Sequence, residues 1–158
     1  MDKFNLRACF LTLFFSGYSK KAPGTIGSLV ALLLGLPVLI FSANTLFLAA
    51  VFIGLIAITQ IDKEEEESKR HDSSHIVIDE LVGMWLAMAI SGLSLASVIL
   101  SFIFFRVYDI TKPSLIGKID KEVKGGLGVV ADDALAGVLA GLSALLVIHI
   151  LGFFNIKL

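Results

Sequence analysis

The chain has 158 residues, of which 56% are hydrophobic and 17% charged, and its mean hydropathy is +0.90. Soluble domains carry about 25% charged residues, so this composition predicts one integral membrane domain, residues 1–158, rather than a soluble protein. The 13 Lys and Arg nearly balance the 14 Asp and Glu, which argues against the basic face that nucleic-acid binding requires. The single cysteine excludes an internal disulfide and a Cys-pair metal site.

The charges leave three long uncharged stretches, at 22–61, 81–105 and 134–156. About 20 apolar residues cross a bilayer as a helix, so the first stretch is too long for one crossing. A polar break at 42–45 divides it. We therefore predict two helices, near 25–41 and 46–61, joined by a tight turn.

The middle stretch, 81–105, could cross the membrane once or fold back at 91–94. The segments 1–21, 62–80 and 106–133 hold 12 of the 13 basic residues, which is the positive-inside pattern if all three face the cytoplasm. We therefore favour a hairpin whose helices start before Asp79 and run past Asp109. A last helix, from Asp132 to about Phe153, then crosses outward. The predicted fold class is an all-α, compact multihelical membrane bundle with hairpin helices and a cytoplasm-facing acidic site.

Five carboxylates lie at the predicted membrane boundaries: Asp79, Glu80, Asp109, Asp132 and Asp133. If the charged segments share one side, these groups surround one cleft and repel one another unless a cation or proton neutralises them. Oxygen ligands without clustered Cys or His favour a hard ion such as Mg²⁺. The alternatives are that Asp132 and Asp133 cap the last helix and that Arg106 and Asp109 form an ordinary i,i+3 ion pair.

Two glycine-rich segments, 23–28 and 125–128, precede predicted helices. Backbone N–H groups at a helix N-terminus can bind phosphate, although a re-entrant turn explains either segment equally well. Thr25 and Ser28 are N-cap candidates in the first segment. Pro113 ends the helix that contains Arg106, so Arg106 and Lys112 would flank the cleft as partners for an anionic headgroup or else extend to the interface. We expect the acidic run at 62–70 to be a solvated helix end or loop.

Four sequence blocks follow one another between residues 16 and 141: Pro23-Gly24-Thr25-x-Gly27-Ser28, Ile76-Val77-Ile78-Asp79-Glu80-x-x-Gly83-Met84-Trp85, Phe105-Arg106-x-x-Asp109-x-x-Lys112-Pro113 and Gly125-Gly126-x-Gly128-x-x-x-Asp132-Asp133-x-x-Ala136-Gly137. Together they resemble the bacterial phosphatidylglycerophosphatase A family. The chain departs from the family pattern at Leu115, where a second proline is usual, and at Lys124.

The resemblance implies a Mg²⁺-dependent inner-membrane phosphatase of phospholipid biosynthesis, which converts phosphatidylglycerophosphate to phosphatidylglycerol and phosphate with its site facing the cytoplasm. We expect four acids to hold Mg²⁺, directly or through water, and four other residues to contact the substrate phosphate. The metal set is Asp79, Glu80, Asp132 and Asp133, and the phosphate set is Arg106, Lys112, Thr25 and Gly126. Asp109 is either a further ligand or the base that orients water. Water and an aspartate both remain candidate nucleophiles, and no protein partner can be inferred.

Two other functions use the same groups. A small ion or proton transporter with interfacial carboxylates predicts acids at mid-membrane and pseudo-repeats, whereas the acids here flank the spans and the stretches 22–61 and 81–105 share no pattern. A metal-dependent lipid phosphotransferase would replace water by an alcohol, but its characteristic spaced Asp motif is absent from the sequence.

Overall fold

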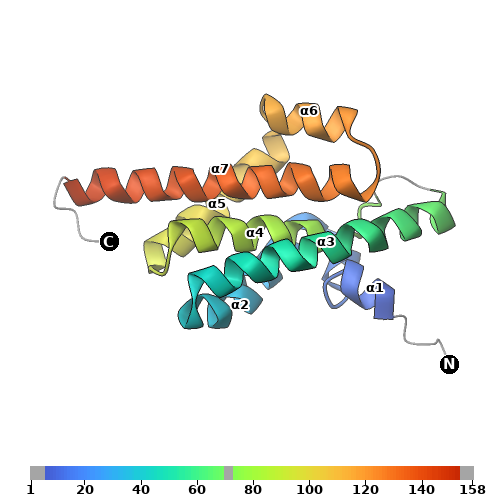
Figure 1. The fold of residues 1–158 in the computed structure, drawn as a ribbon, viewed down its shortest axis with the longest axis horizontal. Coiled ribbons are helices and arrows are strands. Elements are labelled where there is room, and N and C mark those ends of the chain that lie inside the picture. The colour runs from blue at the N-terminus through green and yellow to red at the C-terminus, as the bar shows by residue number, and fades with distance from the viewer. Residues whose placement is uncertain (1–5, 70–72, 154–158) are drawn as a thin grey trace.

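The computed structural model of the chain describes residues 6–69 and 73–153, and the fold within these ranges is entirely helical (Figure 1). It contains seven α-helices and one short 3₁₀ helix: α1 (Leu6–Leu11), η1 (Ser16–Tyr18), α2 (Pro23–Phe41), α3 (Ala43–Ser68), α4 (Ile78–Ser91), α5 (Leu95–Thr111), α6 (Leu115–Glu122) and α7 (Gly125–Phe153). The all-helical prediction is confirmed.

Three of these helices, α2, α3 and α7, are long and apolar enough to cross a membrane. In each, only 28% of an apolar 18-residue window is buried inside the protein, so most residues of the window are at least partly exposed. The predicted break lies at Ser42, whose Oγ accepts a hydrogen bond from the N–H of Thr45 (3.2 Å) at the start of α3. Beyond it, α3 continues through the acidic run as far as Ser68, so the run forms a helix end up to that residue, while residue 70 lies outside the described residues.

The short helix α4 lies at the centre of the bundle, with 12 of its 14 residues buried. It packs against α7, α3, α2 and α5. Small residues allow this close approach: a side chain at Gly137 of α7 would meet the carbonyl oxygen of Gly83. The indole N–H of Trp85 also donates to the carbonyl of Ala31 in α2 at 2.8 Å. As expected for helices in lipid, a small residue takes part in each of these contacts.

The stretch 81–105 does not form one continuous helix. The helix α4 ends at Ser91, Gly92 has a φ of +87°, and Ser94 caps α5 by accepting from the N–H of Ser97 at 2.9 Å. The helix α5 packs back against α4 and ends at Thr111, directly before Lys112 and Pro113. The break predicted at 91–94 is therefore confirmed.

The predicted start of the last helix is wrong. The helix α7 begins at Gly125 rather than Asp132, so the glycine-rich segment forms its first turn and Asp132 and Asp133 lie two turns inside it. The N–H of Gly126 donates to Asp62 Oδ1 of α3 at 2.7 Å, and a side chain at Gly126 would collide with the backbone of α3. Asp62 therefore caps the start of α7, the role that one interpretation of the sequence gave to Asp132 and Asp133.

The start of α2 also differs from the prediction. This helix begins at Pro23, a residue suited to a first helical position, and its N-cap residue is Ala22. Thr25 and Ser28 consequently lie within the helix, and neither is its N-cap.

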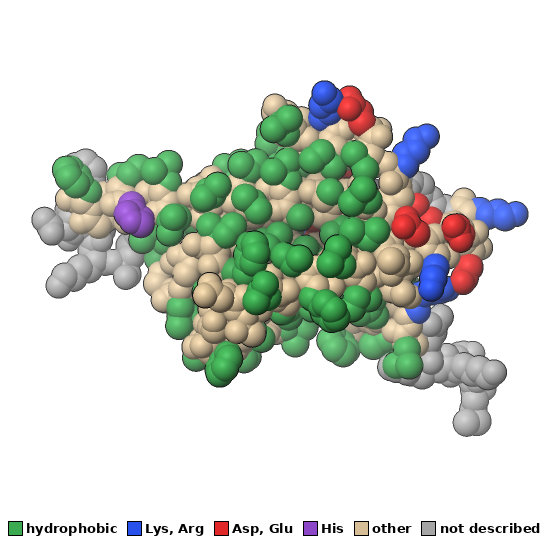
Figure 2. Space-filling view, viewed as in Figure 1, with side chains coloured by type: hydrophobic (Ala, Val, Ile, Leu, Met, Phe, Trp, Pro, Cys, Tyr) green, Lys and Arg blue, Asp and Glu red, His purple; other side chains and the backbone are tan. Residues whose placement is uncertain are grey.

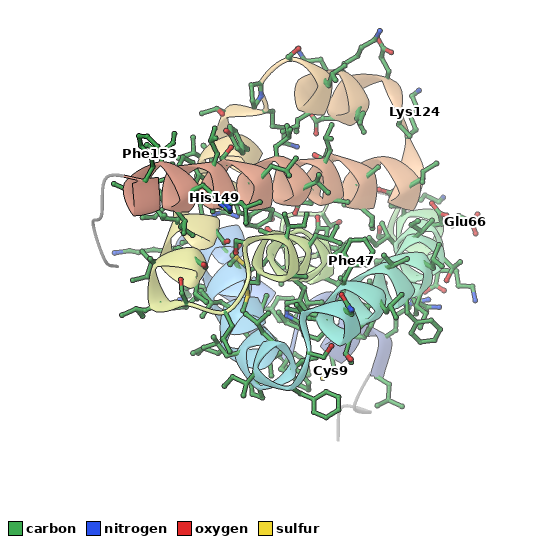
Figure 3. All side chains as sticks on the ribbon, turned by 60° about the vertical axis from the view of Figure 1, so that its left-hand side comes forward. Cys9, Phe47, Glu66, Lys124, His149 and Phe153 are labelled. Carbon is green, nitrogen blue, oxygen red and sulfur yellow. The ribbon has the colours of Figure 1, made fainter. Side chains whose placement is uncertain are left out.

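Charged side chains gather at one end of the bundle. Figure 2 shows acidic and basic groups where α3 ends and α7 begins and over α6, while hydrophobic side chains cover most of the rest of that face. Figure 3 places Glu66 and Lys124 at this end and His149 and Phe153 at the other. The charged end is also where the predicted acidic residues lie along their helices.

Candidate active site

A polar cavity of about 360 Å³ opens where α4, α5, α6 and α7 meet. Ten residues line it: Asp79, Glu80, Asp109, Lys112, Asp120, Val123, Gly128, Val129, Asp132 and Asp133. All five carboxylates singled out in the sequence thus share one cavity, although they come from three different helices.

Three of these carboxylates form a compact cluster, which we call the acidic triad: Asp79, Glu80 and Asp133. One oxygen from each lies within 4.8 Å of the other two. Helix packing explains this convergence, because Gly83 and Gly137 follow Asp79 and Asp133 by four residues, or about one helical turn. Contact between these glycines brings the backbones of α4 and α7 together. It therefore places the two aspartates at the same position along the two helices.

The acidic triad is buried and incompletely paired. Asp79 and Glu80 are each 9% exposed and Asp133 is 4% exposed. Asp79 Oδ1 and Glu80 Oε2 are buried without a hydrogen-bond partner, and such groups are costly unless something satisfies them. Three clustered carboxylates also repel one another.

A divalent cation would remove both penalties, and the donor set fits Mg²⁺. Mg²⁺ prefers oxygen ligands at about 2.1 Å, so opposite ligands around one ion are about 4.2 Å apart, close to the spacing within the triad. The triad can therefore hold a metal ion.

Asp132 faces a different partner, although it lines the same cavity. Its Oδ2 lies 2.7 Å from Lys112 Nζ, which also contacts Asp120 of α6. Burial lowers the pKa of Lys112, but the hydrogen bonds and charges of these two aspartates outweigh it and raise the pKa above its usual range. Lys112 is therefore a fixed cation on the cavity wall.

Sequence reasoning missed Asp120. It lies in a short run of mixed charges on α6, a pattern typical of a solvated helix, and Lys112 is eight residues away. No local spacing indicates this contact, which arises because α6 folds back beside α7.

Arg106 lies beside the triad and is held from two helices. Its Nη1 is 2.7 Å from Asp109 Oδ2, one turn further along α5, and it donates to Ser28 Oγ of α2 at 3.0 Å. The predicted i,i+3 ion pair is therefore present. At Gly24, a side chain would collide with Glu80 Oε1 and lie 3.3 Å from Arg106 Nη2, so the first turn of α2 lies against the site.

Of the four predicted phosphate contacts, only Lys112 is among the residues that line the cavity. Arg106 lies beside the lining through its pair with Asp109, and neither Thr25 nor Gly126 lines the cavity. Thr25 is half-buried in the first turn of α2, and the N–H of Gly126 is already donated to Asp62.

The arrangement combines a buried oxygen-ligand cluster with two held cations, Arg106 and Lys112. Positive charges beside a metal site suit a phosphate monoester, whose negative oxygens must be neutralised before a nucleophile can approach.

Comparison with known proteins points to one family. A model of phosphatidylglycerophosphatase A matches residues 9–148. Phosphatidylglycerophosphatase A of Escherichia coli is 35% identical over 129 residues, covering 80% of this chain and 74% of that protein, and the Haemophilus influenzae protein of the same name is also 35% identical over 129 residues, covering 80% and 79%. A Bacteroides thetaiotaomicron protein with the provisional name phosphatidylinositol-3-phosphatase is 37% identical over 138 residues, covering 80% and 84%. No solved structure matches the chain. The chain belongs to the phosphatidylglycerophosphatase A family.

Proposed function

We propose that this chain is a Mg²⁺-dependent phosphatase that hydrolyses phosphatidylglycerophosphate to phosphatidylglycerol and inorganic phosphate. The observation that carries this proposal is the acidic triad, whose buried, unpartnered oxygens lie close enough together to share a cation. Family membership supports phosphatase chemistry at this cavity and favours it over the transporter alternative.

The triad residues Asp79, Glu80 and Asp133 would hold Mg²⁺, with Asp132 as a fourth ligand or as the anchor of Lys112. Bound Mg²⁺ would supply positive charge that stabilises the phosphoryl oxygens during transfer. The chain's own cations would add positive charge for the same purpose. Arg106 donates N–H groups in a planar fork to the terminal phosphate, and Lys112 contributes a compact charge.

Asp109 has two candidate roles, as a further ligand or as the base that orients the attacking water. Its bond to Arg106 keeps its carboxylate beside the phosphate site and its place in the cavity lining keeps it near the triad. Either role requires a carboxylate near both the cation site and the guanidinium.

The proposed location is the bacterial inner membrane, with the cavity open to the cytoplasm. Three membrane-length helices and the charges gathered at one end of the bundle (Figure 2) support it, because cytoplasmic ends of membrane proteins carry most of the Lys and Arg. The substrate would then enter with its headgroup at the charged end and its acyl chains along the apolar helices.

A second lipid, phosphatidylinositol 3-phosphate, is a candidate substrate because of the name of the Bacteroides relative. Both lipids present a phosphate monoester dianion to the cavity, so the groups described above suit either. Measuring phosphate release from the two lipids side by side, in detergent micelles with Mg²⁺, distinguishes them. We expect the higher kcat/KM with phosphatidylglycerophosphate.

The proposal is tested by replacing Asp79 with Asn and Glu80 with Gln, each of which keeps side-chain shape. We expect phosphate release from phosphatidylglycerophosphate to fall at least about 100-fold, since loss of even an outer-shell partner of a metal ligand reduces activity about 10- to 100-fold. Chelation of Mg²⁺ should abolish the wild-type reaction. Near-normal turnover in both variants would refute the proposal.

A further inference from the structure

A buried serine links α2 to the arginine beside the acidic triad. Ser28 is 0% exposed, and its hydroxyl lies between two partners. It donates to the carbonyl oxygen of Gly24, one turn earlier in α2, at 2.8 Å. It accepts from Arg106 Nη1 of α5 at 3.0 Å. The two residues of this contact are 78 positions apart in the chain.

The bond to Gly24 fixes the direction of the second bond. A serine hydroxyl has one proton to donate, and that proton is committed to the carbonyl of Gly24. A lone pair is therefore left to face Arg106. Because the donor and acceptor roles are both assigned, the hydroxyl cannot rotate away without losing two hydrogen bonds in a buried place.

Ser28 holds Arg106 in a way that Asp109 does not. A carboxylate such as Asp109 fixes a guanidinium and also offsets its positive charge, which weakens its attraction for a phosphate. A neutral hydroxyl fixes the same group and leaves the charge intact. With Nη1 shared between these two partners, Arg106 is held from α2 and from its own helix. Its Nε is buried without a hydrogen-bond partner, so the proposed contact with phosphoryl oxygens falls to Nη2.

We propose that Ser28 is a positioning residue for Arg106: it fixes the guanidinium in the orientation that binds the substrate phosphate. This inference rests on the proposed phosphatase function and on the phosphate-binding role given there to Arg106. Ser28 itself does not touch the substrate. Its contribution is to restrict a long side chain that would otherwise sample many rotamers before the phosphate arrives.

A double-mutant cycle tests the proposal with Ser28→Ala, Arg106→Met and the combined variant, each in detergent micelles with phosphatidylglycerophosphate and saturating Mg²⁺. A hydrogen bond to a charged group corresponds to a change of roughly tenfold or more, so Ser28→Ala should lower kcat/KM at least about tenfold. Because Ser28 acts through Arg106, adding Ser28→Ala to Arg106→Met should change kcat/KM by less than about twofold.

Two further variants separate orientation from packing. Ser28→Cys nearly preserves the buried volume but replaces the hydroxyl by a weak acceptor, so its kcat/KM should be closer to that of Ser28→Ala than to wild type. Ser101→Ala is the matched control, since Ser101 is also 0% exposed, lies on the same helix as Arg106 and donates to Ser91 Oγ at 2.7 Å. Its unfolding midpoint should fall about as far as that of Ser28→Ala, with kcat/KM within about twofold of wild type.

The outcomes are distinguishable. Wild-type kcat/KM in Ser28→Ala, or an equal loss in the wild-type and Arg106→Met backgrounds, overturns the positioning role while the phosphatase function stands. Unchanged kcat/KM in Arg106→Met removes Arg106 from the site, and the positioning role with it. If the wild-type chain releases no phosphate from the lipid, the proposed function itself fails.

Discussion

Replacing Asp133 with asparagine should stabilise the chain when no metal is present and inactivate it when Mg²⁺ is supplied. Asp133 contributes one of three carboxylates whose oxygens lie within 4.8 Å of one another, and it is only 4% exposed. Asparagine has nearly the same shape but no charge. The substitution therefore removes electrostatic repulsion while it also removes a proposed ligand.

The size of the effect follows from the geometry of the triad. The three oxygens lie at most 4.8 Å apart, and two unit charges at that separation repel by about 3 kcal/mol at an effective dielectric constant of about 20. Protonation of one carboxylate relieves part of the repulsion within the triad, so we take about 3 kcal/mol as the scale of the net effect. For a chain of this length, about 1 kcal/mol shifts the unfolding midpoint by about 2–4 °C, which gives a rise of about 10 °C.

Thermal unfolding in detergent, first with EDTA and then across a Mg²⁺ titration, measures the effect. The wild-type midpoint should rise with Mg²⁺, because ligand at about 100 times its Kd stabilises the folded state by about 2.7 kcal/mol. The Asp133→Asn midpoint should start higher in EDTA and rise less, and its rate of phosphate release should fall at least about 100-fold.

The control is Glu66→Gln, which removes a negative charge at an exposed position of α3 at the charged end of the bundle (Figure 3). Its unfolding midpoint and activity should match those of the wild type. An Asp133→Asn midpoint that equals the wild-type value in EDTA and responds equally to Mg²⁺ would refute the reasoning, because it would mean that the three carboxylates neither repel one another nor share a cation.

Two further substitutions probe the walls of the site. Asp120→Asn removes one of the two carboxylates that raise the pKa of Lys112, so it should lower the unfolding midpoint at pH 7. A raised folded pKa contributes stability that is complete below the usual value of about 10.5 and is lost as the pH rises through the folded value, so the difference from wild type should shrink in unfolding scans above about pH 10.5. Gly24→Ala should abolish phosphate release but preserve the fold, because its methyl group would displace Glu80 Oε1; Gly152→Ala, at an open position, should leave phosphate release unchanged.

The apolar helices could be predicted because charge is expensive in lipid. The uncharged stretches 22–61 and 134–156 contain most of α2, α3 and α7, and the polar residue Ser42 separates the first two helices as expected. The same reasoning predicted the break at 91–94, since only a hairpin places all three charged segments on one side. Long-range charge patterning thus predicted the long apolar helices and the hairpin, whereas the short elements α1, η1 and α6 had no such signal.

Helix starts could not be predicted in the same way, because caps need not come from neighbouring residues. Asp132 and Asp133 have the residue type that favours an N-cap, yet α7 begins at Gly125 because Asp62 of α3 accepts from the N–H of Gly126. A cap supplied from 64 residues away leaves no local signal.

The convergence of the acidic residues was predictable from sequence, but their individual partners were not. The placement of five carboxylates at predicted membrane boundaries on one side indicated that they share a site. Which carboxylates stay unpaired depends on where the two cations make their other contacts. Lys112 contacts Asp120 of α6, and Arg106 contacts Ser28 of α2, so the pairing depends on how α6 and α2 pack. Spacing along one helix predicted only the pair of Arg106 with Asp109.

The packing that stabilises the bundle also sets the geometry of its site. In lipid, helices associate through close backbone contact rather than through apolar burial, and α4 and α7 make such a contact at Gly83 and Gly137. Asp79 and Asp133 lie one turn before these glycines, so the distance that brings the helices together is also the distance that brings the carboxylates together. The repulsion within the triad opposes that contact, and a cation at the triad would strengthen it. A cation bound at the triad would therefore be coupled to helix packing through these two glycines.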